Sequence, residues 1–185
     1  MKAGVLALQG DFREHGRMLV AVGATPVQVR TRADLAEVQC LVIPGGESTT
    51  IAKLAHADGL VEPVRERAAA GMPIFGTCAG MIVLARGVIG GAPLFSLMDI
   101  TVRRNAYGRQ VDSFETDLDV RGVDHRVRGV FIRAPWIERV GPEVDVLAEF
   151  EGHPVVLEQG NLLVASFHPE LVGEAGLHDY FLRKV

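Results

Sequence analysis

Residues 73–84 read PIFGTCAGMIVL, and this stretch decides the fold. A short apolar run leads into Gly76-Thr77-Cys78-Ala79-Gly80 and a second apolar run follows, which predicts a strand, a tight turn and a helix. Glycines on both sides let strand and helix approach closely while the cysteine side chain points outward. Backbone N–H groups at a helix N-terminus favour an anion, so the turn favours the nucleophilic thiolate of Cys78. A buried core cysteine beside two packing glycines is the alternative interpretation.

The composition limits the classes of function to consider. The chain has 185 residues, 48% of them hydrophobic, and a net charge of −4 with scattered Lys and Arg, which argues against a nucleic-acid-binding face. Cys40 and Cys78 have neither a paired spacing nor a zinc pattern, as expected for reduced thiols and no metal site. The sequence has no signal-peptide pattern and no 18-residue apolar run, so we expect a cytoplasmic protein that does not enter a membrane.

The first half of the chain alternates strand and helix signals. Continuous apolar runs are typical of strands buried on both faces, and they occur at residues 3–8, 40–43 and just before Cys78. A further short strand is predicted at residues 26–30. Helical patterns or links separate them, including a brief link at 34–38, a helix from about residue 50 and a helix over 61–70. This order predicts right-handed crossovers and a doubly wound, mostly parallel sheet.

Two helix starts carry capping signals. Asp11 and Glu14 resemble a capping box ahead of a helix that ends at Gly23, and Ser48 or Thr49 can cap the helix that begins near residue 50. Phe12, His15, Leu19 and Val22 share one face of the first helix by their spacing. We therefore expect His15 to be a partly buried or surface-lying helix residue rather than a catalytic one.

Three unusual spots follow three of the predicted strands: Gln9, the Gly45-Gly46 pair and Cys78. In doubly wound sheets ligands bind beyond the carboxyl ends of the strands, near the point where the strand order reverses. A loop with two glycines before a helix also presents free N–H groups that can hold an oxyanion or a carboxylate. We expect the three spots to converge on one site, although a Gly-Gly turn is also a common structural connection.

The second half of the chain has a different hydrophobic pattern. Alternating segments predict added antiparallel strands at residues 100–102, 111–120, 130–133, 144–150 and 154–159. A cationic loop at 103–109 lies between them, a last apolar strand covers 161–167, and a helix follows at 174–183. The sequence has neither an internal repeat nor a low-complexity linker, so we expect residues 1–185 to form a single domain.

The last predicted strand ends in Ser166-Phe167-His168-Pro169-Glu170. Pro169 disfavours a helical continuation, and the Glu170 side chain can return to the imidazole of His168 two residues before it. Cys78, His168 and Glu170 then fit the roles of nucleophile, general base and orienting carboxylate. His-Pro-Glu alone is a weak signal, but its combination with the cysteine turn and the Gly-Gly loop is a strong one.

Through these motifs the sequence resembles the class I, or triad, glutamine amidotransferases. More specific segments resemble one branch, the glutaminase subunits of pyridoxal 5′-phosphate synthase (PdxT/SNO family), over essentially the whole chain. These segments are LQG at 8–10, PGGESTT at 44–50, FGTCAG at 75–80, RN at 104–105, GRQVDSFE at 108–115, VFIRAP at 130–135 and SFHPE at 166–170. The resemblance implies a three-layer, flavodoxin-like α/β fold and one glutamine amidotransferase domain over residues 1–185.

The resemblance also implies the chemistry. L-Glutamine would be hydrolysed to glutamate and ammonia through a glutamyl thioester, with Cys78 as nucleophile, His168 as proton carrier and Glu170 as its orienting partner. Backbone N–H groups of Gly46 and Ala79 would form the oxyanion hole. The family pattern assigns the glutamine site to six residues: Gly46, Glu47, Ser48, Arg104, Ile132 and Arg133.

The resemblance further implies a partner and no cofactor. Ammonia would pass to a TIM-barrel synthase subunit in a hetero-oligomeric complex, which builds pyridoxal 5′-phosphate from two sugar phosphates. Docking would adjust the oxyanion hole through Gln9 and the Gly45-Gly46 loop. Neither a cofactor nor a metal is expected in this chain.

Three other functions remain open from the sequence. An unrelated cysteine hydrolase acting on an ester or peptide is disfavoured by Arg104 and Arg133, which suit a free amino acid. A binding subunit that has lost its chemistry is disfavoured by the intact Cys78, His168 and Glu170. The third function is that of a glutaminase for a different ammonia-using synthase, and only the branch-specific segments 104–115 and 130–135 argue against it.

Overall fold

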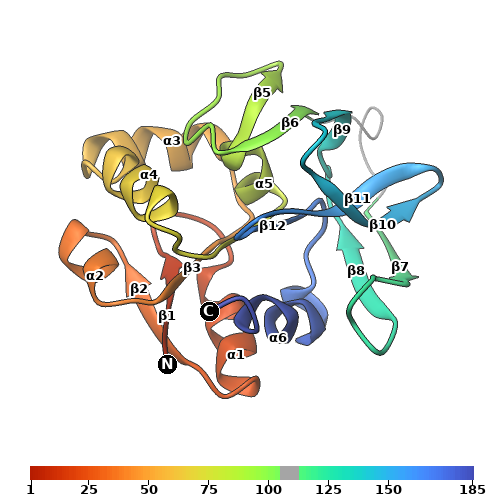
Figure 1. The fold of residues 1–185 in the computed structure, drawn as a ribbon, viewed down its shortest axis with the longest axis horizontal. Coiled ribbons are helices and arrows are strands. Elements are labelled where there is room, and N and C mark those ends of the chain that lie inside the picture. The colour runs from red at the N-terminus through yellow and green to blue at the C-terminus, as the bar shows by residue number, and fades with distance from the viewer. Residues whose placement is uncertain (105–112) are drawn as a thin grey trace.

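The computed structural model describes residues 1–104 and 113–185 (Figure 1). Its central sheet has seven strands, which are from one edge to the other β10 (Asp145–Phe150), β11 (His153–Gln159), β12 (Leu162–Ala165), β4 (Ile74–Thr77), β3 (Cys40–Ile43), β1 (Lys2–Leu6) and β2 (Thr25–Val29). The pairs from β12 to β2 are parallel, whereas β10–β11 and β11–β12 are antiparallel. The predicted parallel core with added antiparallel strands is confirmed.

The two faces of the sheet are both covered, which explains why its inner strands read as continuous apolar runs. All four residues of β3 are buried, and successive side chains point to opposite faces: Leu41 and Ile43 to one, Cys40 and Val42 to the other. Each fully buried aliphatic side chain of this kind stabilises the fold by roughly 1.5–3 kcal/mol.

Helices on the two faces complete the three layers. Helices α2 (Arg32–Ala36), α3 (Ser48–Ala57), α4 (Val61–Ala69) and α5 (Ala79–Leu84) pack on the face of Leu41. Helices α1 (Phe12–Ala21) and α6 (Gly176–Leu182) pack on the face of Cys40 and lie side by side (Figure 1). The first and last helices of the chain therefore share one layer.

Smaller sheets are attached to this core, and they differ in part from the expectation. A hairpin pairs β7 (Phe114–Leu118) with β8 (Val127–Phe131), and a three-stranded sheet joins β5 (Ala85–Ile89), β6 (Met98–Arg103) and β9 (Trp136–Val140). The sequence did not predict β5 or β9, and β5–β6 is parallel rather than antiparallel. Beside β9, the ring of Trp136 lies 3.5 Å from that of His153, measured between centroids.

Both predicted capping signals are wrong in detail. Helix α3 is capped by Glu47, whose carboxylate accepts hydrogen bonds from the backbone N–H groups of Thr49 and Thr50, so Ser48 is already the first helical residue. A carboxylate at this end also complements the helix dipole. Asp11 makes no side-chain capping bond to α1, because its carboxylate faces His168 instead.

The loops after β1, β3 and β4 meet at one edge of the sheet. Strand β1 lies between β3 and β2, so the strand order reverses there. The Gln9-Gly10 turn touches the Gly45-Gly46 loop closely: a Cβ on Gly10 would lie 1.7 Å from the Gly45 carbonyl oxygen. The expected convergence of the strand ends is thus present. Within the described ranges, none of the helices is long and apolar enough to cross a membrane.

Candidate active site

Cys78 occupies a strained turn between β4 and α5. Its φ of 48° lies in the left-handed region, which residues other than glycine seldom adopt. The glycines explain how the turn fits: a Cβ on Gly80 would lie 2.1 Å from the carbonyl oxygen of Ile43, and one on Gly76 would lie 2.7 Å from the Gly80 backbone. The predicted cysteine turn is present, and the thiol faces the sheet edge.

His168 is held beside this turn by the backbone of β8. Its N–H donates to the carbonyl oxygen of Val130 at 2.8 Å. The ring packs on Gly45, where an added Cβ would lie 2.2 Å from the His168 Cε1 atom. A residue with any side chain at position 45 would therefore displace the imidazole.

Glu170 orients the His168 ring. The Glu170 Oε1 atom lies 2.8 Å from His168 Nδ1, and both residues are buried. Burial raises the pKa of the Glu170 carboxyl, but interactions with His15 and His168 outweigh it and hold that pKa well below its usual range. Glu170 is therefore ionised, and Nε2 is left as the His168 nitrogen that serves Cys78.

The protonation of His168 follows from its partners. Burial lowers the pKa of His168, but hydrogen bonds to Cys78 and Glu170 outweigh it and raise the pKa to about 10. The carboxylate of Asp11 lies 3.5 Å from Nδ1 as a second anion, and burial raises the pKa of Asp11. The site thus favours an imidazolium next to the nucleophile, a pairing typical of activated cysteines.

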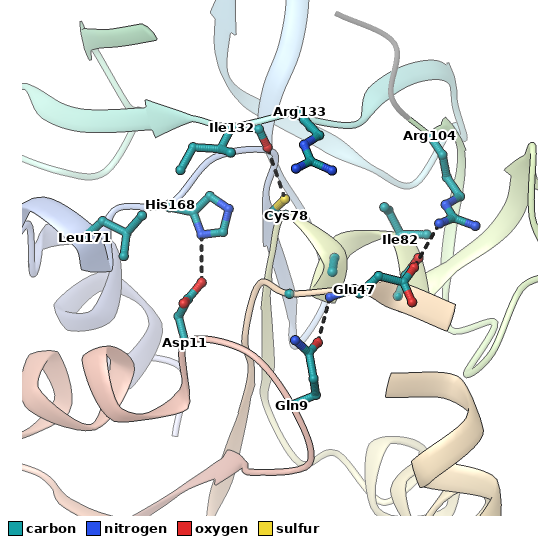
Figure 2. Close-up of a pocket in the computed structure, with 13 residues that line it drawn as sticks. Gln9, Asp11, Glu47, Cys78, Ile82, Arg104, Ile132, Arg133, His168 and Leu171 are labelled. Carbon is teal, nitrogen blue, oxygen red and sulfur yellow. Dashed lines mark hydrogen bonds and ion pairs between the residues drawn. The ribbon is translucent and has the colours of Figure 1, made fainter. Parts of the chain in front are cut away.

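A cavity of about 560 Å³ opens in front of Cys78 (Figure 2). Its walls come from the loops after β1, β3, β4, β6, β8 and β12. The residues that line it are Gln9, Asp11, Gly46, Glu47, Ser48, Cys78, Ala79, Ile82, Arg104, Ile132, Arg133, His168 and Leu171.

One side of the cavity carries a network centred on Glu47. Its backbone N–H donates to Gln9 Oε1 at 2.7 Å, and its carboxylate accepts from Arg104 at 3.1 Å (Figure 2). Hydrogen bonds from the Thr49 hydroxyl, and further bonds from Thr50, lower the Glu47 pKa to about 2. The cavity therefore has a fixed carboxylate next to a guanidinium, a pair suited to a zwitterionic ligand.

The opposite wall is the loop after β8. The carbonyl oxygen of Ile132 lies 4.0 Å from Cys78 Sγ, and Arg133 has a φ of 44° and points into the cavity (Figure 2). Among the residues that the structure describes, two arginines thus reach the cavity, Arg104 near Glu47 and Arg133 near Cys78.

The structure brings together nearly all residues that the sequence singled out. Ten of the twelve predicted site residues line the cavity, Glu170 bonds His168, and Gly45 contacts the His168 ring and accepts a hydrogen bond from the backbone N–H of Asp11. Of the branch-specific segments, residues 105–112 lie outside the described ranges. The roles assigned to all twelve residues stay predictions at this point.

Other residues at the site were missed. Asp11 was expected only as a helix cap, and Ile82 and Leu171 were not singled out. His15 was expected to be partly buried or surface-lying, but it is fully buried and its Nε2 atom lies 3.4 Å from Glu170 Oε1. Only its position on the apolar helix face signalled burial, and nothing in the sequence signalled its neighbour.

A metal site is the other chemistry to consider. In the part of the chain that the structure describes, one group of potential ligands gathers: Asp11, His168 and Glu170, with ligand atoms within 4.8 Å of one another. Nδ1 of His168 already bonds Glu170 Oε1, so a cation would have to break the hydrogen bond that orients the ring. The arrangement fits a Cys-His-carboxylate triad better than a metal site.

Comparisons with known proteins agree on one family. The model of the SNO glutamine amidotransferase family matches residues 5–185. The pyridoxal 5′-phosphate synthase subunit PdxT of Frankia alni is 56% identical over 185 residues, which cover 98% of this chain and 93% of the relative. The protein of the same name from Streptomyces avermitilis is 55% identical over 186 residues, covering 98% and 92%.

A solved structure extends the likeness to three dimensions. A crystal structure described as a glutamine amidotransferase superposes with a TM-score of 0.94 at 48% sequence identity, covering 98% of this chain and 97% of that one. The expected fold class, a flavodoxin-like three-layer sheet with antiparallel additions, agrees with this neighbour.

Proposed function

The chain belongs to the SNO glutamine amidotransferase family as a glutaminase subunit of pyridoxal 5′-phosphate synthase, and we propose from this premise that Cys78, His168 and Glu170 are its catalytic triad. The observation that carries the proposal is the arrangement of Cys78 in a strained turn, with a His168 that Glu170 orients lining the same cavity of about 560 Å³. The products are L-glutamate and ammonia.

The first half-reaction forms a thioester. The Cys78 thiolate attacks the side-chain amide carbon of glutamine, and the carbonyl π electrons move to the oxygen. Backbone N–H groups of Gly46 and Ala79 stabilise this oxyanion, the second being the residue after the nucleophile. His168 gives its Nε2 proton to the amide nitrogen, the C–N bond breaks, and ammonia leaves a γ-glutamyl thioester.

The second half-reaction restores the enzyme. His168, now neutral, takes a proton from water as the resulting hydroxide adds to the thioester carbonyl. The C–S bond then breaks and leaves Cys78 a thiolate beside an imidazolium. The new γ-carboxyl group gives its proton to water, and glutamate leaves. Throughout, Glu170 keeps the Nδ1 hydrogen of His168 in place, as its 2.8 Å hydrogen bond supports.

Glutamine recognition is assigned to the two charged walls of the cavity. Glu47 offers a carboxylate with a pKa of about 2, which can accept the substrate α-ammonium group. Arg104 and Arg133 can donate to the α-carboxylate, while Gly46, Ser48 and Ile132 shape the cavity around the side chain. A free amino acid fits such opposed charges better than an ester does.

The partner is a synthase subunit that consumes ammonia, and we assign it a TIM-barrel fold as the family implies. Gln9 is placed to couple docking to catalysis, because its side-chain oxygen accepts the N–H that follows Gly46. Gly46 has a φ of 151°, and an added Cβ would lie 2.3 Å from that Gln9 oxygen. A shift of Gln9 would therefore change the peptide groups of the proposed oxyanion hole.

We also propose a single domain over residues 1–185 and a cytoplasmic location. The family model covers 5–185, and α1 packs against α6, so the two ends of the chain share one layer. Cys40 and Cys78 are both free, as is typical of proteins in a reducing compartment.

The test is ammonia release from glutamine by the chain alone and with the synthase subunit added. Cys78→Ala should lower the rate in the complex by at least about a thousandfold because it removes the nucleophile, and Cys40→Ala is the matched control that should keep it within about threefold. A wild-type complex that releases no ammonia, or a Cys78→Ala variant that matches it, would contradict the proposal.

A further inference from the structure

Two histidines that the proposed mechanism does not use lie behind the triad. His15 of α1 and His178 of α6 are both fully buried, and His15 Nδ1 lies 2.8 Å from His178 Nε2. The other nitrogen of His15, Nε2, lies 2.9 Å from Thr77 Oγ1 and 3.4 Å from Glu170 Oε1. His15 therefore contacts the residue before the nucleophile, the proposed orienting carboxylate and the last helix at once.

The surroundings of this pair are otherwise apolar. Phe75 packs edge-on against both rings, with centroids 6.4 Å from His15 and 5.4 Å from His178. Burial lowers the pKa of His178 to about 3, so that ring is neutral. Two buried imidazoles cost more than apolar side chains of similar size, so packing alone does not explain them.

The hydrogen on His15 can be placed from its partners. Glu170 is ionised, so a lone pair on Nε2 would face a carboxylate oxygen at 3.4 Å and be repelled. The hydrogen therefore lies on Nε2, shared between Thr77 Oγ1 and Glu170 Oε1. The bond between His15 Nδ1 and His178 Nε2 fixes the rotation of the ring that presents it.

Glu170 needs this second donor. Its Oε1 atom faces both His168 Nδ1 and His15 Nε2, whereas Oε2 has no hydrogen-bond partner among the described residues. Without His15, the one side-chain bond that the described residues offer to this carboxylate is the bond to His168, the ring that it is meant to orient.

We propose that His15 is a positioning residue of the active site, which donates its Nε2 hydrogen to Glu170 and is itself oriented by His178. This inference rests on the proposed function, because it acts through the triad carboxylate. The proposal places His15 and His178 behind the triad as supporting residues. Through them, the last helix of the chain is connected to the reacting thiol.

The test is a double-mutant cycle measured on the complex with its synthase subunit. His15→Leu should lower kcat by about 10–100-fold, because it removes a hydrogen bond that positions a functional side chain. The KM for glutamine should change less than about threefold. In a Glu170→Ala background the same change should lower kcat less than about threefold, because the carboxylate that it orients is gone. Additive losses would overturn the proposal.

A rescue separates positioning from folding. His15→Gln puts an amide N–H near the Nε2 position and should keep kcat within about threefold, whereas His15→Asn reaches only the Nδ1 position and should lose about tenfold. This pair decides the question even if His15→Leu does not fold. Equal kcat for Gln and Asn would overturn the proposal, and the exposed His56→Leu on α3 is the matched control, expected to leave kcat unchanged.

Failure of this inference is distinguishable from failure of the proposed function. If the proposed function fails, the wild-type complex releases no ammonia or does not depend on Cys78. If only the inference fails, the wild type is active and its activity depends on Cys78. In that case the losses of kcat from His15→Leu and Glu170→Ala are additive, or His15→Gln and His15→Asn have equal kcat.

Discussion

Cys40 and Cys78 are both free, both buried and attached to neighbouring strands of one parallel sheet, yet they occupy opposite chemical settings. Cys40 opens β3 at the amino end of the strand, where burial raises the pKa of its thiol to about 12. Cys78 follows β4 at the carboxyl end, where a helix begins and His168 lines the same cavity.

The difference shows how the edge of a parallel sheet sets reactivity. At the carboxyl end, strands deliver loops, helix N-termini and the side chains that follow them, so charge can be placed around a thiol. At the amino end of β3 the thiol of Cys40 packs against apolar side chains and behaves as a small hydrophobic group. Position in the sheet, more than depth of burial, distinguishes the two cysteines.

The largest expected effect is a difference between the two cysteines in their rate of thiol labelling. Iodoacetamide at neutral pH should alkylate Cys78 at least about a hundredfold faster than Cys40, because Cys40 has no exposed surface and a pKa near 12. Mass spectrometry of the labelled peptides measures both rates in one sample. In denaturant the two should react alike, and equal rates in the native protein would contradict the contrast.

Two glycines extend the comparison, Gly4 next to the Cys40 backbone and Gly45 next to the His168 ring. Gly45→Ala would place a Cβ 2.2 Å from His168 Cε1 and move that ring, which should lower kcat about 10–100-fold. Gly4→Ala would crowd methyl groups of Val29 and Val38 at 2.9 Å and the Cys40 carbonyl oxygen at 3.2 Å, which should lower the unfolding free energy by about 1–3 kcal/mol.

Ammonia release and urea unfolding of both glycine variants provide the measurements. Gly4→Ala should keep kcat of the folded protein within about twofold, and Gly45→Ala should lose more activity than stability. If Gly4→Ala instead lowered kcat and Gly45→Ala mainly lowered stability, the carboxyl end of the sheet would not be the catalytic end and the amino end would not be the structural one.

The smallest expected effect concerns alkaline stability. The folded protein keeps the Cys40 proton up to a pKa of about 12, whereas an unfolded chain loses it above about 9. The unfolded state thus gains relative stability as pH rises from 9 to 12, by at most about 1.4 kcal/mol per pH unit from this one group.

Urea unfolding at pH 8, 9 and 10 checks this prediction. Cys40→Ala should be less stable than the wild type at pH 8, because of the lost packing, but its unfolding free energy should fall less steeply above pH 9. Parallel curves for the two proteins would mean that Cys40 does not resist ionisation in the folded state.

The parallel core and the convergence of the candidate site residues could be predicted from the sequence, because both depend on local signals. Apolar runs, glycines and strand ends are short-range features, and parallel strands bring their carboxyl ends to one edge without further information. That rule was enough to place Cys78, Gly46 and Gln9 around one cavity, which they line.

What the sequence could not predict depends on how distant elements meet. His15 reaches Glu170 only because α1 packs against the 3-10 turn that begins at Glu170 and against α6, contacts separated by over 150 residues. Strands β5 and β9 have mixed burial patterns, and their pairing runs through β6, so neither carries a clean period of two. The Glu47 cap was missed because Ser and Thr are the commoner caps.

The ring contact between Trp136 and His153 gives the protein a built-in optical probe. The chain has one tryptophan, and it lies three residues beyond Arg133, on the segment that follows the cavity wall. All indole emission therefore arises from one place, a half-buried ring in contact with a titratable imidazole. Indole fluorescence of the unlabelled protein, excited at wavelengths that its two tyrosines do not absorb, consequently reports on this wall alone and in real time.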